Sequence, residues 1–162
     1  MIADDDTWQP IDQPGLALAI GNFVMAYAGT EMLFHEMLAL YADLPSPVSS
    51  QITAGMSLEA VLSALERLAE LRKVPAAKRK DLDAMIHLVC RDDGLQRFRN
   101  RLVHQSIVFG RGGAELVNFV GRRKGVKMPR LPISAEEIDR RSMEVVALNT
   151  RLIQHMGTWP AG

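Results

Sequence analysis

The sequence has very little cysteine and few aromatic residues. Cys90 is the single cysteine among 162 residues, so neither an intrachain disulfide nor a cysteine metal cluster can form. Aromatic residues make up 6% of the chain, and Leu, Ala and Met are abundant instead, which favours helices over strands. A chain with one thiol is typical of the reducing cytoplasm, where we expect this protein to be located.

The chain also lacks the usual signals for membrane insertion and export. No uninterrupted apolar run reaches the roughly 18 residues of a membrane span. Residues 1–12 are polar and acidic, unlike a secretory or transit peptide. With 48% apolar and 23% charged residues, the composition is that of a globular domain. We therefore predict a flexible acidic tail over residues 1–12 and one domain over residues 13–160, without membrane contact.

Acidic residues are nearly absent from one segment. The formal net charge is +0, but residues 97–130 contain nine Lys/Arg against Glu115 alone, a balance of +8. Residues 1–96 contain seven Lys/Arg against fourteen Asp/Glu, a balance of −7. Like charges gathered in one segment favour an anionic partner there. The alternative is a solvated loop that simply avoids acidic residues.

Apolar residues recur at helical spacing over most of the chain. These stripes predict helices over residues 14–44, 46–55, 57–74, 75–103 and 134–156, with Gly94 as a weak point of the fourth. Ser57 and Ser134 stand where N-caps are expected. The stripe of the last helix includes Val146 and Ile153, which are therefore expected in the core.

The hydrophobic period changes between the last two long helices. Residues 106–109 and 115–120 are predicted as two short strands around a glycine turn, and residues 121–132 as a basic loop. We therefore predict an all-α fold, an up-and-down helical bundle with a small β-hairpin insert before the last helix.

The basic segment begins with a dense group of chemically active side chains. Asn100 and His104 are one turn apart on the same helix face, and the long side chain of Arg99 can reach that face. Histidine transfers protons near neutral pH, and arginine stabilises a phosphate and its transition state. This set suits metal-free transesterification of RNA, in which the ribose 2′-hydroxyl attacks the phosphate and leaves a 2′,3′-cyclic phosphate. The alternative is that His104 only caps the helix C-terminus, with solvated arginines beside it.

Glu31 is a further candidate because it falls on the apolar stripe of the first helix. A carboxylate there is costly unless it is paired, so we expect it to support the site by orienting an arginine or a histidine. The alternative is a glutamate that reaches solvent at the edge of the stripe. Glu31–His35 and Asp83–His87 share helix faces, but di-metal bundles use Glu-x-x-His spacing, so no metal is expected. Phosphate-binding glycine loops and serine nucleophile elbows are not found.

Residues 99–104, with the sequence Arg-Asn-Arg-Leu-Val-His, resemble the Arg-Asn-x-x-x-His motif of HEPN domains. These domains form a superfamily of helical ribonucleases and nucleotide-associated proteins. The motif also occupies a similar position, at the end of the penultimate long helix. The resemblance implies a dimeric, metal-independent endoribonuclease that needs no cofactor, and many such proteins are toxins or antiviral effectors. It implies that Arg99 binds the scissile phosphate, that His104 is the acid/base residue and that Asn100 supports them.

The remaining cations of the segment are expected to contact RNA, namely Arg97, Arg101, Arg122, Arg123, Lys124, Lys127 and Arg130. Besides RNA, the resemblance implies a homodimer and allows a cognate antitoxin or another protein partner. Ser106 stands where a subgroup paired with nucleotidyltransferase antitoxins has a modified tyrosine, so this type of control is not expected. The alternative function is a non-catalytic HEPN-like bundle that binds a partner protein or a nucleotide.

Overall fold

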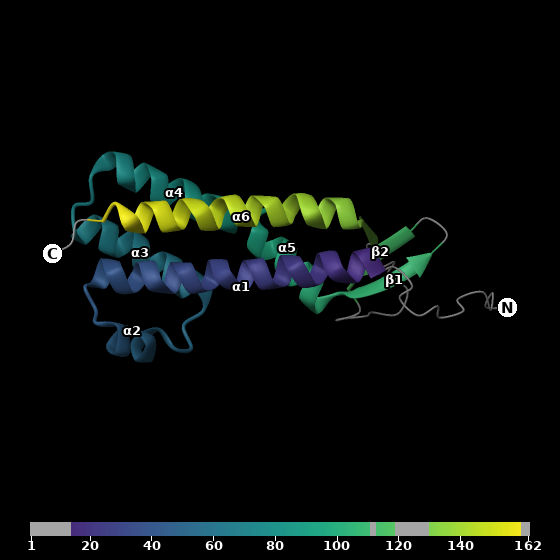
Figure 1. The fold of residues 1–162 in the computed structure, drawn as a ribbon, viewed down its shortest axis with the longest axis horizontal. Helices are drawn as coiled ribbons and strands as arrows, with labels where there is room; N and C mark the ends of the chain where they lie inside the picture. The colour runs from purple at the N-terminus through teal and green to yellow at the C-terminus, as the bar shows by residue number, and fades with distance from the viewer. Residues whose placement is uncertain (1–13, 111–112, 119–129, 160–162) are drawn as a thin grey trace.

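The computed structural model describes residues 14–110, 113–118 and 130–159, so the predicted tail lies outside it. The elements follow in the order α1 (Pro14–Ala42), α2 (Ser46–Thr53), α3 (Leu58–Leu71), α4 (Ala76–Cys90), α5 (Leu95–His104), β1 (Ser106–Gly110), β2 (Gly113–Val117), β3 (Arg130–Ile133) and α6 (Ala135–Gly157). Figure 1 shows α1 and α6 side by side, with α3, α4 and α5 behind them and the strands at the end where both begin. The predicted all-α bundle with a β insert before the last helix is confirmed.

The inner face of α1 supplies the centre of the core. Its aromatic residues Phe23, Tyr27, Phe34 and Tyr41 follow each other at four- or seven-residue spacing and are at most 1% exposed. The ring of Phe23 meets that of Phe98 edge to face, with 5.0 Å between centroids. This contact joins the middle of α1 to α5, the helix that carries the candidate site.

A polar contact sets the register between α1 and α6, which run in the same direction (Figure 1). Thr30 Oγ1 donates a hydrogen bond to Asn149 Oδ1 at 2.7 Å, and Asn149 Nδ2 donates to the carbonyl of Ala26 at 3.1 Å. A partly buried amide is stable here because both of its ends have partners. The two long helices are therefore held together as one layer.

Two of the helices start at the serine caps that the sequence predicts. Ser57 Oγ accepts a hydrogen bond from the backbone N–H of Ala60 at 3.3 Å, at the start of α3. Ser134 Oγ accepts one from the N–H of Glu137 at 3.2 Å, at the start of α6. Each bond satisfies an N–H group that has no partner within the helix.

The predicted single helix over residues 75–103 is wrong, because the chain breaks between α4 and α5 at residues 91–94. Gly94 closes this turn by donating its N–H to the carbonyl of Arg91 at 2.7 Å. A Cβ at residue 94 would lie 2.4 Å from the carbonyl oxygen of Val89, closer than a carbon can approach. The absence of a side chain at Gly94 thus allows α5 to leave the direction of α4.

The sheet has one strand more than the sequence predicts. β1 and β2 form the expected hairpin, in which Ser106 pairs with Val117, and β3 adds an antiparallel partner to β2. The predicted loop over residues 121–132 is therefore wrong at its end, and residues 119–129 lie outside the described part. The sequence gives little sign of β3, because this strand has four residues and includes Pro132.

The prediction that Val146 and Ile153 belong to the core is also wrong. They are 49% and 57% exposed, whereas Val145 and Leu152, one residue earlier in each case, are fully buried. One residue turns the helix by about 100°, so the two stripes lie on different sides of α6.

Residues Gly15–Ala42 of α1 are long and apolar enough to cross a membrane, with a mean hydropathy of 1.3. The inner face of this helix nevertheless holds the core.

We predict that Gly94→Ala lowers the free energy of unfolding by about 1–3 kcal/mol, because the new Cβ overlaps backbone that cannot move without displacing α5. Urea unfolding followed by circular dichroism measures this change. Gly157→Ala is the control, since a Cβ there meets no atom within 4 Å, and it should change the stability by less than about 0.5 kcal/mol. Equal effects of the two substitutions would contradict the role of Gly94.

Candidate functional site

The inner face of α5 fixes the orientation of the candidate site. Phe98, 4% exposed, packs on Phe23 of α1, and the guanidinium of Arg141 from α6 lies 5.4 Å from its ring centre. Arg141 is itself 8% exposed and is paired with Glu137 and Glu144 at 3.2 and 3.1 Å. A buried arginine with two carboxylate partners and an aromatic neighbour is held in place, so α5 is held from both long helices.

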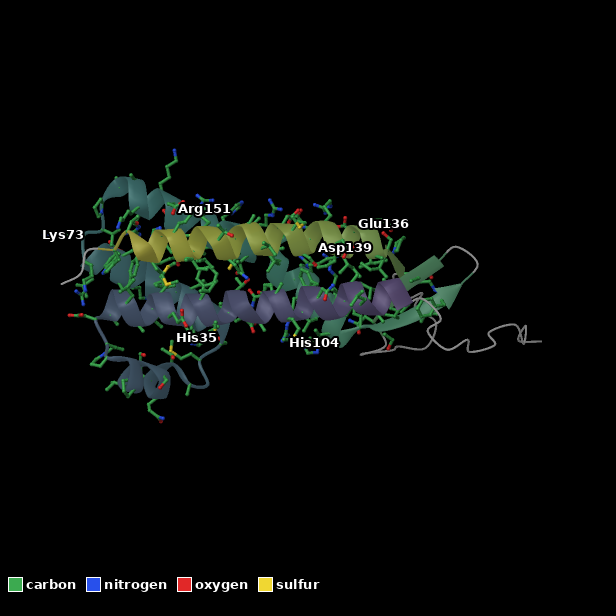
Figure 2. All side chains as sticks on the ribbon, viewed as in Figure 1. His35, Lys73, His104, Glu136, Asp139 and Arg151 are labelled. Carbon is green, nitrogen blue, oxygen red and sulfur yellow. The ribbon has the colours of Figure 1, made fainter. Side chains whose placement is uncertain are left out.

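The outer face of α5 lines an open hollow of about 270 Å³. Arg97, Asn100, Arg101 and His104 contribute from this helix, because residues three, four and seven positions apart share a helix face. Gln105 and Asn118 complete the lining where the hairpin begins and ends. Figure 2 shows the labelled His104 on the side of α1 that faces away from α6.

This hollow is electrostatically suited to an anion. Arg101 and His104 lie in the last turn of α5, where the helix dipole favours positive charge. Arg97 donates to the carbonyl of Asp92 at 3.2 Å and lies 3.6 Å from its carboxylate, so its charge is partly balanced. The lining residues include no carboxylate of their own. A phosphate entering the hollow would therefore meet hydrogen-bond donors, and the carboxylate of Asp92 is paired with Arg97.

Arg99 does not line this hollow but lies next to it. Its Nη1 donates to Asn100 Oδ1 at 3.2 Å. On the α1 side, the pKa of the Tyr27 hydroxyl is raised by burial first and by Glu31 second, while the charge of Arg99 lowers it. Asn100, which lines the hollow, thus links Arg99 to it.

The other predicted site residues are placed as follows. Glu31 is half-buried, and among the described residues no hydrogen bond or ion pair joins it to an arginine or a histidine. Arg130 on β3 pairs with Glu115 on β2 at 3.1 Å, so its charge is balanced within the sheet. The remaining predicted RNA-binding residues lie outside the described residues, namely Arg122, Arg123, Lys124 and Lys127.

Gln105 and Asn118 were not singled out from the sequence. The hairpin register brings them together, because Ser106 pairs with Val117 and the residues that flank this pair are Gln105 and Asn118. A signal for this proximity exists in the sequence, since two strands around a short glycine turn must return the chain to its starting point. The hairpin therefore contributes polar side chains to the hollow as well as connecting α5 to α6.

The two acid–histidine pairs considered for a metal are separated. His35 lines a different, largely apolar hollow of about 510 Å³ between α1 and α2, together with Met32 and Leu40. Asp83 lies 3.9 Å from Arg79 one turn earlier in α4. Within residues 14–110, 113–118 and 130–159, no three His, Cys, Asp or Glu side chains are grouped closely enough to hold a metal ion.

A second polar cluster, which the sequence did not indicate, joins α1, α4 and α6. His155 is 4% exposed, with its Nδ1 2.8 Å from Asp81 Oδ2 and its Nε2 2.8 Å from the hydroxyl of Tyr41. Arg151 donates to Asp81 Oδ1 at 2.6 Å. Burial acts to raise the pKa of Asp81, but the hydrogen bonds from His155 and Arg151 outweigh it and hold this pKa below its ordinary value. The cluster clamps the end of α6.

No family model, curated protein or solved structure matches this chain. A likeness to HEPN domains is therefore limited to the resemblance of residues 99–104 and to the position of this motif in the bundle.

We predict that Asp81→Asn destabilises the protein most strongly near neutral pH. The folded state holds the pKa of Asp81 below that of the unfolded chain, so the ionised carboxylate stabilises the fold above the unfolded pKa of about 3.9. This stabilisation is lost as the pH falls through the folded value. Urea unfolding of both proteins between pH 6 and pH 2.5 should show the difference in stability shrinking with acid, and a constant difference would contradict the assignment.

Proposed function

We propose that this protein is a metal-independent endoribonuclease of the HEPN type, located in the cytoplasm and serving as a toxin or an antiviral-defence effector. The observation that supports this proposal best is the position of His104 in a solvent-open hollow with two arginines, an asparagine and no carboxylate. A proton-transfer group surrounded by phosphate-binding donors is the minimum that RNA transesterification requires.

The proposed reaction uses the 2′-hydroxyl of the substrate as its nucleophile. His104 accepts the hydroxyl proton as the oxygen attacks the neighbouring phosphorus. The bond from phosphorus to the 5′-oxygen then breaks, and this oxygen takes the proton back from the protonated imidazole of His104, which gives a 2′,3′-cyclic phosphate and a 5′-hydroxyl. Arg99 stabilises the charge on the phosphate from its position beside Asn100, and Arg97 and Arg101 bind the RNA backbone. DNA lacks the 2′-hydroxyl and should not be cleaved.

The second candidate function is a non-catalytic bundle that binds a nucleotide or a protein partner. The same donors that favour a scissile phosphate would also hold a nucleotide phosphate in the open hollow. Under the first proposal, an antitoxin or another protein would restrain the nuclease. The second function predicts that the protein binds its nucleotide or protein partner without cleaving RNA. It also predicts that His104→Ala leaves this binding unchanged.

We predict that His104→Ala lowers the rate of RNA cleavage at least about 100-fold, because it removes the proposed general base. Cleavage is measured in EDTA on single-stranded RNA, with a DNA strand of the same sequence as a substrate control. The matched control variant is His87→Ala, at an exposed histidine on α4, which should retain full activity. Equal rates for wild type and both variants would refute the nuclease proposal.

We also predict that Arg99 and Arg101 have different roles in the reaction. Arg99→Ala should lower the rate at saturating RNA by about 100-fold, as expected for a group that stabilises the transition state. Arg101→Ala should weaken RNA binding and reduce the slope of log Kd against log salt by about 1, with little change in the saturated rate. Kinetics at two salt concentrations measure both effects, and identical behaviour of the variants would contradict this division.

A further inference from the structure

The outer face of α1 is apolar, and none of the residues that the structure describes covers it. Leu18, Met25 and Met32 are 65%, 74% and 57% exposed, and their seven-residue spacing puts them in one row along the helix. From residue 14 to residue 30 the helix has no Asp, Glu, Lys, Arg or His. A helix of a monomer normally places charges on its outer face, whereas α1 is apolar on both its inner and its outer face.

α6 extends this apolar surface. Met143, Val146 and Ile153 are 68%, 49% and 57% exposed. Val146 and Ile153 lie one turn before and one turn after Asn149, which is hydrogen-bonded to α1, so both border the outer face of α1. Figure 1 shows the two helices as one layer with no other helix in front of them. The six exposed residues form what we call the α1–α6 face.

A glycine in the middle of this face has no steric explanation among residues 14–110, 113–118 and 130–159. Gly21 lies in the interior of α1, where glycine is less favourable than alanine. A Cβ at residue 21 would meet no atom within 4 Å, so nothing in the described structure requires its absence. A second helix packed closely on α1 would require it, because small residues let helix backbones approach each other.

The pattern on α1 is symmetric about Met25. Gly21 and Gly29 lie four residues before and after it, and Leu18 and Met32 lie seven residues before and after it. An antiparallel copy of α1 crossing at Met25 would therefore place Leu18 against Met32 of the other copy and Gly21 against Gly29. A two-fold interface must be complementary to itself, and a sequence pattern that is symmetric under reversal has this property.

We propose that the α1–α6 face binds a second copy of this chain, with the two α1 helices antiparallel and crossing at Met25. The two helices cover roughly 35 Å by 20 Å, or about 700 Å², close to the ~800 Å² that each partner contributes to a stable interface. Charged residues border the face: Arg140 is paired with Glu137 and Glu144 on α6, and Glu36 follows the apolar row on α1. An apolar centre with a charged rim is the usual composition of a protein interface.

The test is the mass of the protein in solution, measured by light scattering and sedimentation at 1–100 µM. Wild type should have twice the chain mass of 18.0 kDa. Met25→Glu puts two carboxylates at the symmetry axis and should weaken the dimer at least about 100-fold, leaving a monomer with an unchanged circular dichroism spectrum. Leu71→Glu is the matched control, at a residue 76% exposed on α3, and should remain a dimer.

A second variant separates the interface from the stability of the helix. Gly21→Leu improves helix propensity and should still give a monomer, because the side chain blocks the close approach of α1. A wild-type mass of 18.0 kDa at 100 µM, or a dimer that survives both Met25→Glu and Gly21→Leu, overturns the proposal. Monomeric wild type that floats with phosphatidylcholine–phosphatidylglycerol vesicles, while Met25→Glu does not, assigns the face to a membrane surface and also overturns it. These masses are measured without RNA, so they do not depend on nuclease activity.

Discussion

The close backbone contact at Gly94 sets the direction of α5, and the position of the candidate site depends on that direction. Without a side chain, residue 94 can lie against the carbonyl of Val89 and turn the chain out of α4. α5 then places Phe98 on Phe23 and under Arg141, with its other face outward. If α4 and α5 were one straight helix, their buried residues could not all face the core. The arginines and His104 would then lie elsewhere. A local steric requirement thus determines a functional arrangement.

The residues of the Arg-Asn-x-x-x-His motif on α5 do not all line the hollow. His104 shares the hollow with Arg97, Asn100 and Arg101 because of the helical period. Arg99 does not line the hollow, and its positive charge acts to lower the pKa of the buried Tyr27 hydroxyl. Asn100 is the link, through its hydrogen bond with Arg99. The motif that resembles HEPN domains therefore places Asn100 and His104 in the hollow and Arg99 beside it.

α1 stabilises the protein in two directions. Its inner face holds the aromatic core, and its outer face is apolar as well, which neither the core nor the candidate site requires. At the far end of the same helix, Tyr41 is hydrogen-bonded to His155, which is hydrogen-bonded to Asp81 in turn, so α1, α4 and α6 meet in one polar cluster. Core packing and these polar contacts thus hold α6 beside α1.

The sequence by itself determined the helical class, the serine caps, the hairpin and the grouping of arginines around His104, because all of these follow from local periodicity and capping. The tertiary structure decided what depends on contacts between distant residues. In the structure the predicted fourth helix is interrupted at Gly94, and β3 pairs with β2. Val146 and Ile153 are exposed, and Asn118 lines the same hollow as Gln105. The structure also joins Asp81 to His155, which are 74 residues apart. Periodicity shows which residues share one element, but only packing shows which elements meet and which faces stay uncovered.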